Sequence, residues 1–205
     1  MVESLPVWAL LKRARERIYT LPETFPGFSA SVAFYFKGLW YFGRVKVEGF
    51  RPEVELPEGM GPLAERELAS LLGHRRPVPF EEGEGRYAMR LVEEGPLGTA
   101  IALNDPFRSR IWVRHGRIEV IERSLAEGSF RIHLEAWQEV GEKLLPKRFF
   151  LVHRDPKGRL IKVERFRDTY ASFQGLWLPV EREVVVEATD METIVLRLED
   201  VEVYA

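Results

Sequence analysis

The sequence of 205 residues is long enough to bury a sizeable core, and we expect a single domain over residues 1–205. Its formal net charge of -2 arises from 30 basic and 32 acidic residues interspersed along the chain, which indicates neither a nucleic-acid partner nor a membrane surface. The lack of cysteine excludes disulfides, thiolate metal sites and cysteine nucleophiles.

The first predicted element is an N-terminal helix. Apolar residues recur there at helical spacing, and Ser4 is a suitable N-cap. Two prolines and a glycine between residues 21 and 27 then favour a turn. Alternating side chains over 28–37 and 40–48 follow, and they predict a long β-hairpin. The helix has a single face to bury, formed by Leu5, Trp8, Leu11, Ala14 and Ile18.

A second, short amphipathic helix is predicted near residues 62–72, with Pro62 in its first turn and Gly73 at the position of a C-cap glycine. After it, a segment rich in proline and glycine leaves one strand over 86–92. The remainder of the chain reads as regular strands joined by short connections, which enforce antiparallel neighbours. These strands follow residues 99–104 and cover 109–115, 117–122, 130–139, 148–154, 160–167, 177–187 and 193–204.

The predicted fold is therefore α+β: a strongly curled antiparallel sheet, or half-barrel, of about 9–10 strands packed on the N-terminal helix. Such a sheet has a concave, apolar inner face.

Two segments carry a resemblance to a known family: residues 19–32 (YTLPETFPGFSASV) and 74–85 (HRRPVPFEEGEG), with the hairpins over 112–120 and 121–135 after them. Together they resemble an uncharacterised family, a domain of unknown function common in cyanobacteria. The order of elements is also similar to the LolA-like half-barrel of lipoprotein carriers. This resemblance implies a cavity for a lipid or another apolar group, although no export signal is found at the N-terminus.

The densest polar cluster of the predicted loops is a candidate ligand site formed by His74, Arg75, Arg76, Phe80 and Glu81. Guanidinium groups suit an anionic head group, because they form paired hydrogen bonds with carboxylates and phosphates. The alternative is structural, since His and Arg beyond a helix end also interact with its exposed carbonyl groups.

Trp112 and Trp137 are further candidate ligand-binding residues. Strand alternation places each of them on a face rich in charged side chains. They either line the mouth of a cavity or face solvent, because amphipathic rings often occupy such boundaries.

No catalytic residue, metal ligand or cofactor is predicted. His115, His133 and His153 lie on separate predicted strands without metal-ligand spacing, and neither a phosphate-binding loop nor a Gly-x-Ser-x-Gly motif occurs. We expect a non-enzymatic domain that binds a small apolar or amphipathic, lipid-like ligand in the concavity of its sheet. A protein-interaction domain that uses its sheet surface or edges is the first alternative, and an enzyme is the second.

The composition also suggests where the protein works. Only Asn104, Gln138 and Gln174 carry side-chain amides, and this depletion of heat-labile residues suggests a thermophilic source. No run of apolar residues reaches the roughly 20 needed to span a bilayer, and we expect a cytoplasmic protein. The oligomeric state does not follow from the sequence.

Overall fold

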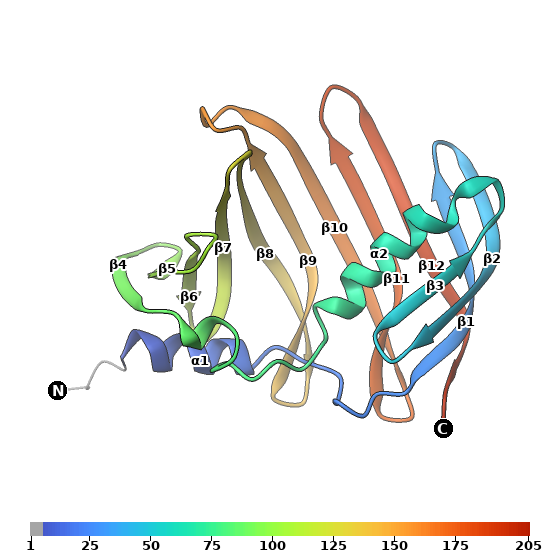
Figure 1. The fold of residues 1–205 in the computed structure, drawn as a ribbon, viewed down its shortest axis with the longest axis horizontal. Coiled ribbons are helices and arrows are strands. Elements are labelled where there is room, and N and C mark those ends of the chain that lie inside the picture. The colour runs from blue at the N-terminus through green and yellow to red at the C-terminus, as the bar shows by residue number, and fades with distance from the viewer. Residues whose placement is uncertain (1–5) are drawn as a thin grey trace. The chain divides into compact units, whose positions relative to one another are not determined.

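A computed structural model describes residues 6–205, in which two α-helices and twelve β-strands are found (Figure 1). The helices are α1 (Val7–Glu16) and α2 (Gly61–Gly73). The strands follow one another in a sheet in the order β3-β2-β1-β12-β11-β10-β9-β8-β7-β6-β5-β4. The sheet is unclosed, because β3 and β4 stand at opposite ends of this order. The predicted α+β class with an antiparallel sheet is confirmed. The strands are β1 (Gly27–Phe36), β2 (Leu39–Glu48), β3 (Arg51–Glu55), β4 (Met89–Gly95), β5 (Gly98–Leu103), β6 (Arg110–Arg114), β7 (Arg117–Leu125), β8 (Gly128–Val140), β9 (Lys143–Arg154), β10 (Leu160–Phe173), β11 (Leu176–Glu187) and β12 (Met191–Val203).

Several details differ from the sequence-based expectation. The count of 9–10 strands was too low for residues 6–205, because β3 and β5 were missed. In β3, Pro52 and three charged residues conceal a short terminal strand. The strand expected over 86–92 begins later, at Met89. Gly73 does not end its helix in the left-handed conformation, since helical geometry continues to His74. The expected contributions of Ser4 and Leu5 lie outside the described residues.

The chain divides into two compact units, and each of them combines two separate segments. Unit 1 joins Tyr19 and the described residues before it to Val78–Glu164. Unit 2 joins Thr20–Pro77 to Arg165–Ala205. That the chain forms one domain stays a prediction.

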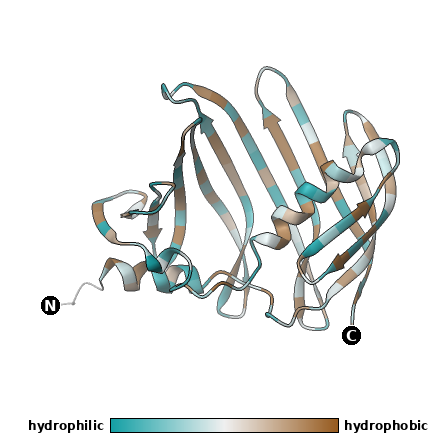
Figure 2. Ribbon diagram, in the orientation of Figure 1, coloured by the Kyte–Doolittle hydropathy of each residue, from teal (hydrophilic) through white to brown (hydrophobic). Residues whose placement is uncertain are grey.

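In unit 1, α1 packs against one face of the antiparallel strands β4 to β7. Alternation explains this arrangement, because every second side chain of a strand points to the same face. Figure 2 shows the resulting change of hydropathy from residue to residue along these strands. The core between the helix and the strands contains Leu11, Ala14, Phe80, Ile101, Leu103, Ile111, Val113, Ile118 and Ile121.

In unit 2, α2 contacts β3, β11 and β12, and it crosses in front of the last two in Figure 1. The residues of β1 that face the helix side are buried, whereas Ser29, Ser31, Ala33 and Tyr35 lie on the other face. The register places Phe34 beside Tyr41 of β2 and Leu196 of β12. The buried set of this unit includes Phe28, Ala30, Val32, Phe34, Val45, Val47, Leu68, Leu71, Leu72, Leu196 and Leu198.

Candidate functional site

The best candidate for a ligand surface in unit 1 is a row of large apolar side chains on β8 and β9. Ile132 pairs with Ile121 of the core on one side and with Leu151 on the other, so these residues share the face that carries α1. The helix packs on β4, β6 and β7. Ile132 and Leu134 of the row pack against the edge of the α1 core, and all side chains of the row remain partly exposed. This β8–β9 apolar strip consists of Phe130, Ile132, Leu134, Phe149 and Leu151.

One end of the β8–β9 apolar strip is polar. His153 pairs with Phe130 across the strands, and the two ring centroids are 6.1 Å apart. The Nε2 atom of His153 lies 2.5 Å from Oε2 of Glu164, whose other oxygen lies 3.3 Å from Nζ of Lys162. All three polar groups are partly exposed. They can therefore contact the polar end of a molecule whose apolar part follows the strip.

Trp137 lies on β8 beyond Leu134, toward the opposite end of the strip. Its Nε1 atom is buried and has no hydrogen-bond partner among the described residues. A buried donor without an acceptor costs about 1–3 kcal/mol, and such groups are rare in folded proteins. Trp137, one of the predicted ligand-binding residues, thus holds an unpaired donor beneath the surface close to the strip, which a ligand reaches only if the neighbouring side chains move.

The other predicted residues of unit 1 have structural surroundings. Phe80 is a core residue and meets Trp8 edge-to-face at 5.2 Å. Glu81 forms an ion pair with Lys12 of α1. Of the two alternatives for Trp112, solvent exposure is wrong: the side chain is 4% exposed, and the guanidinium of Arg131 lies over its ring at 5.2 Å.

The predicted residues of unit 2 follow the end of α2. The backbone amide of His74 donates to the carbonyl of Ser70. Arg75 is buried. Burial raises the pKa of the nearby Tyr170, and the charge of Arg75 opposes this rise. Arg76 lies over the ring of Phe50 at 5.5 Å, where it lines an open pocket of about 560 Å³. The predicted cluster is thus divided between the two units, and its role in ligand binding stays a prediction.

The sequence reading missed a buried network of charges in unit 2. Nε and Nη2 of Arg182 on β11 donate to the two carboxylate oxygens of Asp168 on β10, both at 2.7 Å. Nη1 of the same guanidinium lies 3.3 Å from Oγ of Ser70 and 3.5 Å from Oε2 of Glu67, both on α2. The network therefore fastens the helix to the sheet.

Burial shapes the proton equilibria of this network. Burial lowers the pKa of Arg182, but the hydrogen bonds and charges of Asp168 and Glu67 outweigh it, so the net shift is upward. Burial also raises the pKa of the neighbouring Tyr170 to about 12. Both groups keep their protons at neutral pH, so neither is suited to act as a general base.

A signal for this network was present in the sequence. Arg182 falls in phase with Leu178 and Val184 along its strand, and Asp168 falls between Phe166 and Tyr170 in the same phase. A charged residue at an apolar position of a strand is costly unless it is paired. Opposite charges at such positions on consecutive strands therefore predict a buried ion pair.

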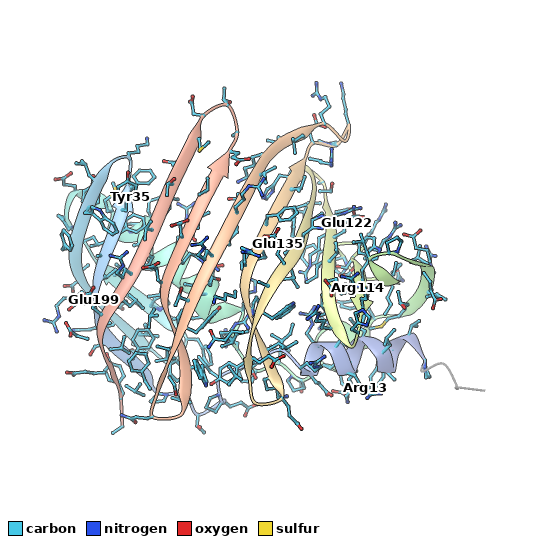
Figure 3. All side chains as sticks on the ribbon, turned by 180° about the vertical axis from the view of Figure 1, so that it is seen from behind. Arg13, Tyr35, Arg114, Glu122, Glu135 and Glu199 are labelled. Atoms are coloured by element: carbon cyan, nitrogen blue, oxygen red, sulfur yellow. The ribbon has the colours of Figure 1, made fainter. Side chains whose placement is uncertain are left out.

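The face of unit 2 away from α2 carries exposed aromatic residues. Trp40 is 41% exposed and Phe42 is 68% exposed, and their rings stack at 6.5 Å. Tyr35 meets Trp40 at 5.3 Å, and the guanidinium of Arg197 lies over Trp40 at the same distance. Figure 3 labels Tyr35 on this side of the sheet. We call this set the β1–β2 aromatic patch.

Within residues 6–205, no group of three or more His, Asp or Glu side chains could hold a metal ion. None of the helices in this range is both long enough and apolar enough to cross a membrane.

The fold and the candidate sites define an α+β protein with an open antiparallel sheet and partly exposed apolar surface. The chain belongs to the family described as protein of unknown function (DUF3386), whose model matches residues 3–202. The family expected from the sequence is thereby confirmed. A search among curated proteins finds no match.

Two solved structures have similar folds. A domain from Vibrio parahaemolyticus, provisionally assigned as an outer membrane lipoprotein-sorting protein, is 11% identical, with a TM-score of 0.42 over 97% of this chain and 92% of that chain. A LolA superfamily protein from Nitrosomonas europaea is 13% identical, with a TM-score of 0.35 over 98% and 95% of the two chains.

Proposed function

We propose that this protein binds a small lipid-like ligand on the β8–β9 apolar strip. The observation that supports this proposal is the half-buried state of five large apolar side chains on one face of two neighbouring strands. Large contiguous apolar surface is uncommon on soluble proteins and often marks a binding site. Covering it with an apolar molecule is favourable by about 25 cal/mol per Å².

The polar groups at the ends of the strip favour an amphipathic ligand. The His153, Glu164 and Lys162 side chains offer donors and acceptors at one end, and Nε1 of Trp137 offers a donor toward the other. Residues 130 to 137 of an extended strand span roughly 23 Å at about 3.3 Å per residue. An extended acyl chain with a polar head suits such a length and such ends.

A matched pair of variants tests this assignment. Leu151 pairs with Ile132 on the strip, whereas its neighbour Val152 pairs with Arg131 on the opposite face, and both side chains are half-buried. Leu151→Gln should weaken the binding of the uncharged dye Nile red about twofold to fivefold, because covering the exposed part of a leucine side chain contributes about 0.5–1 kcal/mol. Val152→Gln should leave the affinity unchanged. Equal effects of the two variants would refute the location.

Native mass spectrometry of protein purified from its natural host identifies the cargo. We expect an additional mass that disappears on denaturation and that belongs to an amphipathic molecule. A copurifying molecule without an apolar part would contradict the proposal.

A second candidate function, a protein-interaction domain, is favoured by the β1–β2 aromatic patch. Trp, Tyr and Arg are the residues most enriched in the energetic centres of protein interfaces. The sheet edges are less suitable, because the terminal strand β3 carries Arg51, Glu53 and Glu55, and charged residues discourage edge pairing. If this alternative is right, substitution of Trp40 abolishes partner binding while Leu151→Gln does not.

A further inference from the structure

The face of β4, β5 and β6 away from the α1 core contains a pocket of about 490 Å³ that the proposed lipid site does not use. Its centre is set by the register of the three strands: Arg90 pairs with Ala102, and Ala102 pairs with Arg110. The neighbouring positions Ile101 and Ile111 belong to the core on the α1 side, so Ala102 and Arg110 point the other way. The row Arg90, Ala102 and Arg110, which lines the pocket, therefore lies on the opposite face from the β8–β9 apolar strip.

The small side chain of Ala102 keeps this pocket open. Adjacent strands of a sheet are about 4.8 Å apart, so Arg90 and Arg110 stand roughly 10 Å from each other across β5. Only a methyl group fills the position between them. Two long cationic side chains thus flank a gap that a small molecule can enter. Arg108 and Asn104 complete the polar lining.

The positive charge of the pocket is not compensated within the described part of the chain. The guanidinium groups of Arg90, Arg108 and Arg110 form no ion pair or hydrogen bond with residues 6–205. The carboxylate nearest in register, Glu122, lies opposite Arg110 but is bound by Arg131 on the next strand. Figure 3 labels Glu122 on this face. Three arginines therefore line the pocket without a counter-ion from the part of the chain that the structure describes.

The loop that carries Arg108 is held in place. The carboxylate of Asp105 accepts hydrogen bonds from the backbone amide and the hydroxyl group of Ser109, both at 2.6 Å. The amide of Arg108 donates to the carbonyl of Asp105 at 3.0 Å. Arg108 itself has a φ of 45°, in the left-handed region that residues other than Gly adopt at a cost in energy. The loop thus fixes an arginine at a position where glycine would be less strained.

We propose that this pocket binds a small organic anion that bears two or more carboxylate or phosphate groups. Guanidinium groups recognise both kinds of group through paired, charge-assisted hydrogen bonds. Two anionic groups are needed to neutralise most of the three positive charges. A volume of about 490 Å³ exceeds the space of a single inorganic ion, and Ala88 and Ala102 add apolar lining, which favours an organic skeleton.

Isothermal titration calorimetry with citrate, fructose 1,6-bisphosphate, inorganic phosphate and glucose tests this proposal. Citrate, the bisphosphate or both should bind, which also separates a carboxylate from a phosphate preference, and glucose should not. Arg110→Gln should weaken the binding about tenfold or more, because it removes a charge-assisted hydrogen-bonding pair. Arg13→Gln is the control, since Arg13 is an exposed residue of α1 and the change in net charge is the same.

Arg108→Gly is a second variant that separates binding from folding. It removes one guanidinium group and relieves the left-handed backbone strain, so the affinity should fall while the melting temperature stays the same or rises. Failure of both organic anions to bind, or binding of inorganic phosphate alone, overturns the proposal. So does an equal loss of affinity in Arg13→Gln, which would indicate attraction by net charge rather than a site.

Discussion

Replacing Asp168 by Asn should lower the melting temperature markedly, because Arg182 would lose the carboxylate that neutralises it inside unit 2. Both side chains are almost completely buried, at 1% exposure for Asp168 and 2% for Arg182. The amide of Asn has one acceptor oxygen in place of two and carries no charge. The variant therefore leaves a guanidinium ion in the interior with only partial compensation.

The expected magnitude follows from this burial. Breaking a buried ion pair by removing one partner costs about 3–5 kcal/mol. Glu67, whose Oε2 atom remains 3.5 Å from Nη1 of Arg182, places the expected cost near the lower value. For a chain of this length each kcal/mol shifts the melting temperature by about 2–4 °C, so we expect a decrease of roughly 6–12 °C.

Thermal unfolding followed by circular dichroism is a suitable assay, and the chain offers a matched control. Arg197 and Glu181 form an ion pair with the same 2.7 Å separation, but Arg197 is 45% exposed. Glu181→Gln should cost less than about 1 kcal/mol, because solvent screens an exposed pair. Replacing both buried partners, Asp168→Leu with Arg182→Met, should be less harmful than Asp168→Asn alone. Equal destabilisation by Asp168→Asn and Glu181→Gln would refute this reasoning.

Three further predictions concern other parts of the chain. Burial and the charge of Arg131 lower the pKa of His133 below 6.5, so the unfolded chain binds more protons at this position than the folded chain does. The free energy of unfolding should therefore fall as the pH drops below 6.5. Urea titrations of His133→Gln should show a weaker fall. Trp137→Phe removes a buried donor that lacks a partner, so the melting temperature should not decrease, whereas binding of a ligand with a hydrogen-bond acceptor should weaken. Gly98→Ala should lower the melting temperature more than Gly38→Ala. An added Cβ would lie 2.3 Å from a backbone oxygen of β6 at Gly98, whereas it would meet nothing within 4 Å at Gly38. Equal effects of the two variants would show that only the positive φ of these glycines matters.

The secondary structure was largely predictable because it depends on local patterns. The alternation over 28–48, the helical spacing around Leu11 and Ala14 and the turn at Asp155 each act within a few residues, and the structure has elements at these places. Strand β3 escaped prediction because its side chains alternate with charged residues around Pro52. Such a composition is also typical of a loop.

The candidate site was predictable only in part, because strand pairing determines it. Trp137 was chosen from its residue type, and its role in ligand binding stays a prediction, although its buried Nε1 atom has no partner among the described residues. The β8–β9 apolar strip depends on which residues lie opposite each other, and the pocket beside Ala102 depends on two arginines from different strands. Neither arrangement can be read from residues close in sequence. The clustering of Arg75 and Arg76 was visible in the sequence, but the burial of Arg75 was not.

The most direct test of the proposed function is photo-crosslinking with an uncharged long-chain alcohol that carries a diazirine in its chain, followed by mapping of the adducts by peptide mass spectrometry. We expect adducts on residues 130–134 of β8 and 149–151 of β9, reduced in Leu151→Gln and retained in Val152→Gln. Adducts confined to Trp40 and Phe42 of the β1–β2 aromatic patch would contradict it and would favour the interaction domain.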